Sequence, residues 1–343
     1  MDSLPPELVQ AIAVLLPQSD LFHLRLTCRG IAATTFDIAI ENVSVLDTSY
    51  SLASLLSFLR SCRAKLPTHT LTIYSGYWSS YSKDAWLVHP LLRRERNGTL
   101  LLRHKGSADA TEADAAFMRY TNFFNTETSR DPAEDLRTFE DISRYMPNLT
   151  SFVLVPLHQM GLQWSQNSKV GALARQIWML PSPRCALKTL DRVLELSLGL
   201  RSIEKLSIYG KLHLNGLPRR RSQTIRVLNI YSATMNCTRS LVDFLSLFPS
   251  VQSLQLSMRI RTGMNLHCLA LPEIRSLKLQ NVNVSEDSLF KFIVCSPQIA
   301  TIRLGEEALS MGSWRGFNSR LLALGRPVEV VLDKSSWKSG VGG

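Results

Sequence analysis

The sequence predicts an α/β fold in which a short helical segment precedes a regular alternation of strands and helices. Two observations predict this class. The start of the chain carries amphipathic helical patterns, and its second half repeats one short motif in steps of 22 to 26 residues. Each copy ends in the two-residue alternation of a strand, and apolar residues at helical spacing lie between copies. A doubly wound α/β domain, which also alternates strands and helices, is the main alternative.

The first predicted helix spans the residues between two proline signals. Pro5 and Pro6 fit a helix start, and Pro17 marks its end. Apolar residues recur on one face between them, at Leu8, Ile12, Leu15 and Leu16. Asp2 and Glu7 precede this run where a secretion signal would carry positive charge, so we expect a structural helix.

Two further helices are predicted before residue 45. Ser19 or Asp20 caps the second helix and Gly30 closes it, and its apolar stripe consists of Leu21, Leu24 and Cys28. The third helix covers residues 31–41 and is rich in β-branched residues. A segment this short cannot bury so many leucines by itself. We therefore expect its apolar face to pack against the rest of the chain or against a second protein.

The repeated motif consists of a proline, an aliphatic residue two positions later and a final x-Leu-x-Leu pattern. Four copies align without gaps, "MPNLTSFVL", "FPSVQSLQL", "LPEIRSLKL" and "SPQIATIRL", and two copies lack the proline, "LRSIEKLSI" and "SQTIRVLNI". The proline-equivalent positions are 147, 201, 223, 249, 272 and 297. The step of 54 between the first two is about twice the others. We therefore expect one degenerate repeat between residues 155 and 200.

The elements around these repeats follow from the same patterns. Helical spacing is present at residues 241–248 and 289–293. The segments "LPTHTLTIY" and "GRPVEVVLD" are weaker copies that extend the array at its two ends. Residues 75–145 fit the repeat poorly, and we expect helices at 111–124 and 131–146, joined by an insertion.

The start of the chain resembles the F-box family. The matching residues, in order and without gaps, are Leu4-Pro5-x-Glu7-Leu8, Ile12, Leu16-Pro17, Asp20-Leu21, Leu24-Arg25-Leu26 and Cys28-Arg29. The later repeats resemble leucine-rich repeats of the long, helix-containing kind. The resemblance implies a three-helix F-box at 1–45, irregular repeats with an insertion at 46–145, and a leucine-rich-repeat solenoid with a concave parallel sheet at 146–343. An alternative is that the helices only cap the first repeat.

The resemblance also implies a function, substrate recruitment by a cullin-RING ubiquitin ligase of the SCF type. An F-box docks on the Skp-type adaptor, which attaches to a cullin and a RING subunit, while the repeats bind an unidentified protein substrate. By this analogy the adaptor-binding residues are Leu4, Pro5, Leu8, Ile12, Leu16, Leu21, Leu24 and Cys28. Such a protein is a non-catalytic subunit, and we expect it in the cytoplasm, the nucleus or both.

Strand alternation divides the repeats into an inner and an outer set of side chains. The predicted inner set is Leu206, Ile208, Leu228, Ile230, Leu254, Leu256, Leu277, Leu279, Ile302 and Leu304. The predicted outer set, on the concave face, is Lys205, Tyr209, Asn229, Tyr231, Gln255, Lys278, Gln280 and Arg303. Its cations, amides and tyrosines suit a polar or acidic peptide, so we expect the substrate to bind there.

Motifs for chemistry are absent from the sequence. It contains no GxxxxGK[ST], GxGxxG, HExxH or GxSxG pattern, no CxxC pair among its six cysteines and no histidine pair at helical spacing. We therefore expect no cofactor, no metal site and no catalytic residues. No apolar stretch reaches the length of a membrane span, so we expect no membrane association.

The chain is basic, with a formal net charge of +11. Two clusters of cationic residues are present, Arg93, Arg94 and Arg96 in one and Arg219, Arg220 and Arg221 in the other. We expect both clusters to lie in loops. A basic scaffold that binds nucleic acid or acidic proteins is therefore the alternative function. The sequence contains no motif that combines aromatic and basic residues for stacking on nucleic-acid bases. We therefore consider a nucleic-acid partner the less favoured interpretation.

Overall fold

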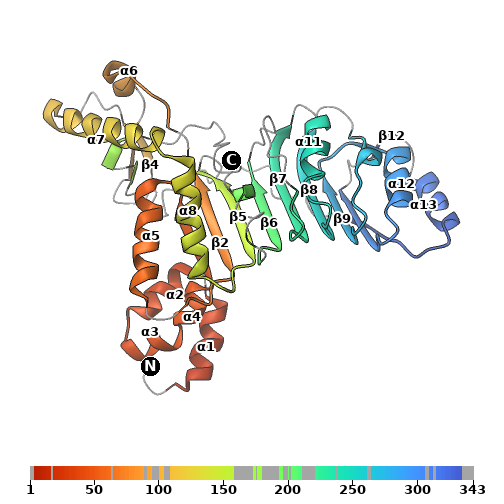
Figure 1. Ribbon diagram of the computed structural model, residues 1–343, viewed down its shortest axis with the longest axis horizontal. Helices are drawn as coiled ribbons and strands as arrows, with labels where there is room; N and C mark the ends of the chain where they lie inside the picture. Colours follow the sequence, from red (N-terminus) through yellow and green to blue (C-terminus); the bar gives the residue numbers. More distant parts are fainter. Residues whose placement is uncertain are drawn as a thin grey trace.

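The computed structural model shows a mixed α/β protein built on an open sheet of nine parallel strands (Figure 1). It describes residues 4–333 apart from 17, 63–64, 77, 89–90, 95–99, 104–108, 158–172, 175, 180–192, 196–199, 201, 211–220, 236–237, 261–263, 306–308 and 312–313. The predicted α/β class is confirmed. Within these ranges no helix combines the length and the apolar character that crossing a membrane requires.

The nine strands lie side by side in the order in which they occur along the chain. They are β1 (Asn42–Leu46), β2 (Thr70–Ser75), β5 (Ser151–Pro156), β6 (Lys205–Tyr209), β7 (Val227–Met235), β8 (Ser253–Ile260), β9 (Ser276–Gln280), β11 (Thr301–Gly305) and β13 (Glu329–Asp333). A doubly wound sheet reverses its strand order at a switch point. This sheet has no such reversal, which excludes the doubly wound alternative.

Each of the six repeats places its strand at the same point of the motif. The strands β5, β6, β7, β8, β9 and β11 all begin four residues after the proline-equivalent position. One hydrogen-bond pattern recurs where they begin. The carbonyl of Gln252 accepts from the N–H groups of Arg275 and Ser276, and the carbonyl of Arg275 accepts from Ala300 and Thr301. The same double acceptance occurs at Glu41, His69, Thr150, Glu204 and Arg226.

This pattern also includes the two weaker copies of the motif. The carbonyl of His69, just before β2, accepts from Thr150 and Ser151, and the carbonyl of Ala300 accepts from Glu329 at the start of β13. The prediction that the array extends at both ends is confirmed. A ninth strand, β1, was not predicted. It pairs with β2 over its whole length, so the sheet begins inside the segment 1–45 that the sequence assigns to helices.

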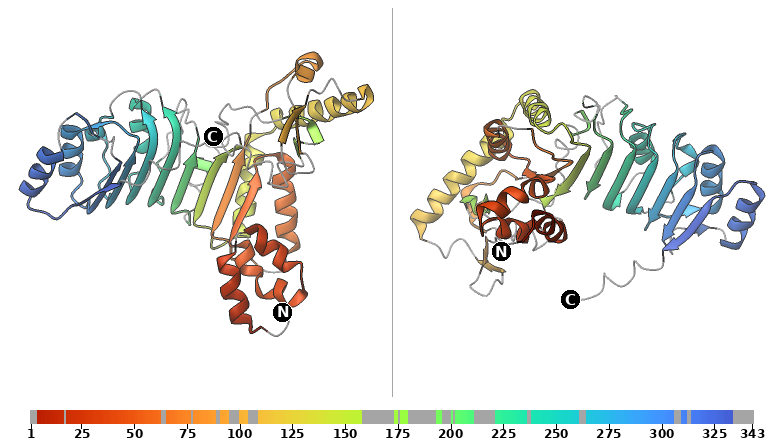
Figure 2. Two further views of the ribbon diagram at one scale, coloured as in Figure 1. Left: turned by 180° about the vertical axis from the view of Figure 1, so that it is seen from behind. Right: turned by 90° about the horizontal axis from the view of Figure 1, so that it is seen from below.

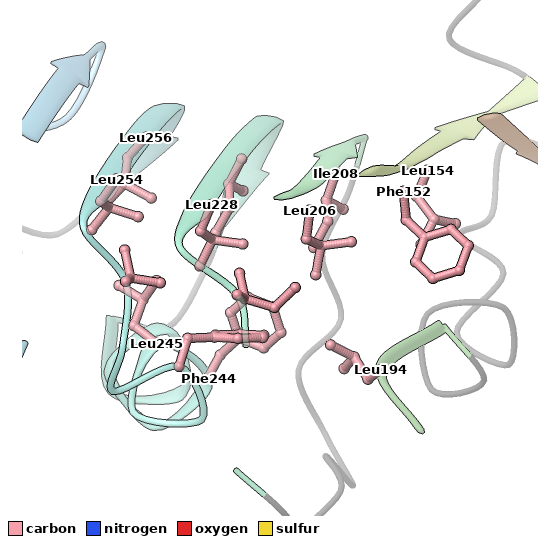
Figure 3. Close-up of a cluster of buried hydrophobic side chains, with 14 of the residues drawn as sticks. Phe152, Leu154, Leu194, Leu206, Ile208, Leu228, Phe244, Leu245, Leu254 and Leu256 are labelled. Atoms are coloured by element: carbon pink, nitrogen blue, oxygen red, sulfur yellow. The ribbon is translucent and has the colours of Figure 1, made fainter. Parts of the chain in front are cut away.

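Helices cover one face of the sheet (Figure 2). They are α5 (Ser49–Ser61), α8 (Pro132–Arg144), α11 (Thr238–Leu245), α12 (Glu286–Cys295) and α13 (Trp314–Ala323). The core lies between these helices and the inner strand residues, as Figure 3 shows for Leu228, Leu254, Phe244 and Leu245. All ten side chains of the predicted inner set are at most 4% exposed.

The prediction of a degenerate repeat between residues 155 and 200 is wrong. Strand β5 pairs directly with β6, with Ser151 opposite Lys205, so no strand of the main sheet lies between them. A short helical turn at residues 193–195 places Val193 and Leu194 in the main core instead. Residues 193–195 therefore supply core side chains rather than a strand.

The insertion between β2 and β5 forms a separate group of elements beside one end of the sheet (Figure 1). It contains α6 (Lys83–Val88), an antiparallel hairpin of β3 (Leu91–Arg94) and β4 (Leu100–Arg103), and α7 (Ala110–Thr128). A second core of aromatic residues, among them Trp78, Trp86 and Tyr120, lies under α7. Both helices predicted for this region are present, as α7 and α8.

The remaining elements are short. Strands β10 (Val284–Ser285) and β12 (Leu309–Met311) form a small parallel pair, and a 3₁₀ turn, η3 (Leu266–Cys268), packs against α12.

Four helices precede β1, namely α1 (Pro6–Leu15), α2 (Gln18–Arg25), α3 (Arg29–Thr34) and α4 (Phe36–Ile40). The prediction of a single third helix at 31–41 is wrong, because the chain forms two helices, α3 and α4, that are separated at Thr35. The buried hydroxyl of Thr35 donates to the carbonyl of Ile31 at 2.7 Å, a bond that bends helices. Contrary to the prediction, Gly30 does not end α2. It lies in α3, and the sulfur of Cys28 caps that helix by accepting from the N–H of Ile31 at 3.4 Å.

Candidate functional site

The helices α1 to α4 have a very small core of their own. Its buried members are Ala13, Leu21 and Ala39, and Leu16 and Ile38 pack against them. Large apolar side chains of α1 and α2 instead face solvent. Leu8 is 52% exposed, and Leu15 and Leu26 are each 84% exposed. Of the apolar stripe predicted for this helix, Leu8, Ile12 and Leu15 therefore point away from the small core, while Leu16 packs against it.

We call the exposed residues of this region the α1–α2 apolar set. It consists of Leu4, Leu8, Ile12, Val14, Leu15, Phe22 and Leu26. Leu8, Ile12 and Leu15 recur at i, i+4 and i+7 and so share one face of α1. Phe22 lies on α2, and Leu26 directly follows the end of that helix. Exposed apolar side chains in this number are typical of a protein interaction surface.

The eight predicted adaptor-binding residues divide into three groups in the structure. Leu4, Pro5, Leu8 and Ile12 are exposed, while Leu16, Leu24 and Cys28 are half-buried. Leu21 is only 3% exposed and belongs to the small core, so it supports the helices from inside. The prediction omits Leu15, Phe22 and Leu26, although Leu15 lies on the same predicted stripe as Leu8.

The helices are attached to the sheet through the end of α4. Ile40 is buried in the main core, and its carbonyl accepts a hydrogen bond from the hydroxyl of Thr68 at 2.7 Å. The next carbonyl, that of Glu41, accepts from His69 and Thr70 at the start of β2. The guanidinium of Arg25 also lies 5.1 Å from the ring centre of Phe36, so α2 is held against α4. These contacts fix α4 to the first two strands of the sheet.

The second candidate surface is the outer face of the sheet, on which all eight residues of the predicted outer set lie. Lys205, Tyr209 and Arg303 are exposed, and the other five are half-buried. Strand register aligns seven of these eight side chains in two rows across neighbouring strands, and Lys205, at the start of β6, lies outside both rows. One row is Ser207, Asn229, Gln255, Lys278 and Arg303, and the other is Tyr209, Tyr231, Ser257 and Gln280.

Contacts between strands order the centre of this face. The rings of Tyr209 and Tyr231 stack with centroids 4.5 Å apart, and the hydroxyl of Tyr231 donates to Gln255 Oε1 at 3.2 Å. The amide of Asn229 donates to the hydroxyl of Ser207 at 3.1 Å. Burial, and then the neighbouring Tyr209, raise the pKa of Tyr231 above its ordinary value of 10.0. These bonds restrict the side chains before any ligand is present.

The outer face is basic between β6 and β11. Its outward positions there include Lys205, Lys278 and Arg303 and no aspartate or glutamate among the described residues. A carboxylate follows at Glu329, on the last strand. Opposite charges attract along such a surface, so the face suits an acidic or neutral polar segment rather than a basic one.

The structure contains a third surface that the sequence did not predict, a groove of about 830 Å³ between α5 and α7. Its walls come from segments more than 50 residues apart, and no motif marks either one, so no sequence signal could have joined them. Arg119, Asn122 and Phe123 line it from α7, and Tyr50 and Phe58 line it from α5.

The remaining sequence predictions concern charge clusters and metal ligands. Arg93 and Arg94 lie in strand β3 rather than in a loop, Arg221 is exposed just before β7, and Arg96, Arg219 and Arg220 lie outside the described residues. Within the described ranges, no group of three or more histidine, cysteine or acidic residues is arranged to hold a metal ion. No model of a known protein family matches the chain, and no curated protein matches it.

Proposed function

We propose that this protein is a substrate-recruiting subunit of a cullin-RING ubiquitin ligase. The observation that carries the proposal is the α1–α2 apolar set, exposed on a segment whose sequence resembles an F-box. Burying one such side chain stabilises a complex by about 1.5 to 3 kcal/mol, so even three of them form an effective anchor. The proposed partner is a Skp-type adaptor, bound through Leu4, Pro5, Leu8 and Ile12.

The adaptor-binding set that we propose differs from the set drawn from the sequence alone. We leave out Leu21, because its side chain is buried within the helices, and we add Leu15, Phe22 and Leu26. Leu16, Leu24 and Cys28 remain in the proposed set, and their side chains are half-buried.

We further propose that the sheet is a leucine-rich-repeat solenoid. Its strands follow chain order, and the same double hydrogen bond links successive strand starts from β1 to β11, with a single bond continuing to β13. Both features are what stacked repeats with nearest-neighbour contacts require. In this proposal the outer face of the sheet binds the substrate, and its basic and amide side chains select an acidic segment.

The mechanism of such a subunit is proximity. It performs no bond-making step and instead holds the substrate at high effective concentration near a ubiquitin-charged enzyme elsewhere in the complex. The fixed attachment of α4 to the first strands supports this role, because it sets the distance between the two binding surfaces. Assembly with a cullin would place the protein in the cytoplasm or the nucleus.

The proposal is tested by binding purified Skp-type adaptor to the full chain. Leu8→Asp together with Ile12→Asp should weaken binding by at least a hundredfold, because both side chains are exposed at the proposed interface. Leu322→Asp is the control, since Leu322 is also an exposed helical leucine but lies on α13 at the opposite end of the sheet. Equal affinity of the double variant and the wild type would refute the proposed interface.

A second function is favoured by one observation, the absence of carboxylates from the described outer face between β6 and β11. A basic scaffold would bind nucleic acid or an acidic protein there, with α1 to α4 only capping the sheet. This alternative predicts affinity for RNA or DNA that falls steeply as the salt concentration rises. It also predicts that the Leu8→Asp and Ile12→Asp changes leave that affinity unaltered.

A further inference from the structure

The groove between α5 and α7 has a closed end. Ser49, the first residue of α5, donates two hydrogen bonds to Glu127 Oε1 in the last turn of α7, from its N–H at 2.9 Å and from its hydroxyl at 2.8 Å. The two walls of the groove therefore meet at this point. A groove that is closed at one end suits a compact ligand. Its volume of about 830 Å³ lies in the range usual for small-molecule sites.

Two charged side chains are present among the described residues that line the groove, Arg119 and Glu127. Both oxygens of Glu127 are occupied, one by Ser49 and the other by Arg130 at 2.9 Å. Arg119 donates through Nε to the carbonyl of Gln176 at 2.9 Å, and its terminal Nη groups make no hydrogen bond to any residue that the structure describes. Among the described lining residues, Arg119 is therefore the cation that can donate to a ligand, while the carboxylate of Glu127 is held by Ser49 and Arg130.

The rest of the groove is lined by aromatic and aliphatic side chains. On α5, Tyr50 is 83% exposed and Phe58 is 46% exposed. On α7, Phe123 lines the opposite wall, and the indole of Trp78 contacts its ring edge-on with centroids 4.9 Å apart. Trp78 is buried, so the orientation of Phe123 is fixed from behind. Aromatic walls of this kind favour a flat apolar molecule.

We propose that the α5–α7 groove binds a small organic anion, with its flat apolar body against Phe58 and Phe123 and its carboxylate or sulfonate on Arg119. Asn122, one turn from Arg119 on the same wall, supplies a further polar group beside the anion. The site lies on the insertion and α5, apart from both surfaces of the proposed ligase function. The proposed site therefore does not depend on the proposed ligase function, and the two can be tested separately.

Two dyes of nearly the same shape test the proposal on the full chain. 8-Anilinonaphthalene-1-sulfonate carries the flat body and the anion, and N-phenyl-1-naphthylamine carries the body alone. In fluorescence titrations Arg119→Gln should weaken binding of the sulfonate about tenfold, because a charged hydrogen bond is lost, and leave the neutral dye unchanged. Phe58→Ala should weaken both dyes. Arg137→Gln on α8 is the matched control for the loss of one exposed arginine.

Two outcomes would overturn the proposal. One is sulfonate affinity that is the same for Arg119→Gln and Arg137→Gln, with thermal unfolding showing that both variants are folded. The other concerns location, because the sulfonate dye could bind the α1–α2 apolar set. Hydrogen exchange should slow in α5 and α7 when the dye is bound, whereas slowing confined to α1 and α2 would place the dye elsewhere.

Discussion

The guanidinium of Arg130 lies 3.1 Å from the carboxylate of Asp47, a residue 83 positions earlier in the chain. The same guanidinium also pairs with Glu127 at 2.9 Å and with Asp135 at 2.8 Å. All four side chains are at most 13% exposed. Burial by itself would lower the pKa of Arg130, but the three carboxylates raise it overall. One buried cation thus joins the end of β1 to α7 and α8.

Arg130→Met should reduce the free energy of unfolding by about 3 to 5 kcal/mol, because it leaves three buried carboxylates without their cation. Arg144→Met is the control, since the side chain of Arg144 is 73% exposed and its pair with Asp141 should contribute less than about 1 kcal/mol. Urea denaturation followed by circular dichroism measures both changes. Equal effects of the two substitutions would contradict the role assigned to Arg130.

Leu8 and Leu21 should differ sharply in their effect on stability. Leu21→Ala creates a cavity in the small core of α1 to α4 and should destabilise these helices by about 2 to 5 kcal/mol, whereas Leu8→Ala should change stability by less than about 0.5 kcal/mol. Hydrogen exchange of α1 to α4 measures the local effect. If Leu8→Ala destabilised the helices as much as Leu21→Ala, its side chain would have to be part of the core.

Ile302 and Arg303 test the alternation of inner and outer side chains on one strand. Ile302 is fully buried, so Ile302→Ala should reduce the free energy of unfolding by about 2 to 5 kcal/mol. Arg303 is exposed on the other face, so Arg303→Ala should stay within about 0.5 kcal/mol of the wild type. Thermal unfolding of the two variants gives the comparison, and a reversed order would place the strand in the opposite orientation.

Tyr231 should make stability fall at alkaline pH. Because burial raises its folded pKa above 10.0, the proton is held more tightly in the folded protein. The stabilisation from this group is complete below pH 10 and is lost as the pH rises through the folded pKa. The stability advantage of the wild type over Tyr231→Phe should therefore shrink between pH 10 and higher pH in urea titrations. A difference that stays constant with pH would show that Tyr231 does not titrate in this way.

The basic outer face should bind an oligoglutamate peptide in a salt-dependent manner. Reversing two of its charges, with Lys205→Glu and Arg303→Glu, should weaken binding about three- to tenfold, the range expected for exposed charges. Fluorescence anisotropy of a labelled peptide at two salt concentrations measures both effects. Reversal of Arg137 and Arg144 on α8 is the control, because these exposed arginines lie on the helical layer.

The strands of the sheet could be predicted from the sequence wherever the repeated motif is present. All six copies of the motif form strands at the same position, including the two that lack the proline, because alternating apolar residues at a fixed spacing indicate a buried strand. Strand β1 carries a weak form of this pattern, since "AIENVSV" aligns with the proline-free copy "SIEKLSI". The sequence prediction missed it, because the β-branched stretch at 31–41 predicts a helix that runs up to the strand, and the pairing with β2 shows the strand.

The candidate sites were predictable to different degrees. Alternation along strands was enough to place the outer set, since a period of two residues leaves a single choice of face. For α1 and α2, periodicity found the apolar stripe but could not say which leucine faces inward, as Leu21 shows. The α5–α7 groove depends on where α7 meets Ser49, a tertiary contact that no local pattern encodes.

Strand order also has a consequence for the order of folding. Strands β8 and β9 pair residues only 23 positions apart, Ser253 with Ser276, whereas β2 and β5 pair Thr70 with Ser151, roughly 80 positions apart. Closing the longer loop costs about 1 kcal/mol more in chain entropy. We expect the strands after β6 to assemble first, and the junction between β2 and β5 to close late. Slowed folding after mutation should therefore map to the C-terminal half of the sheet.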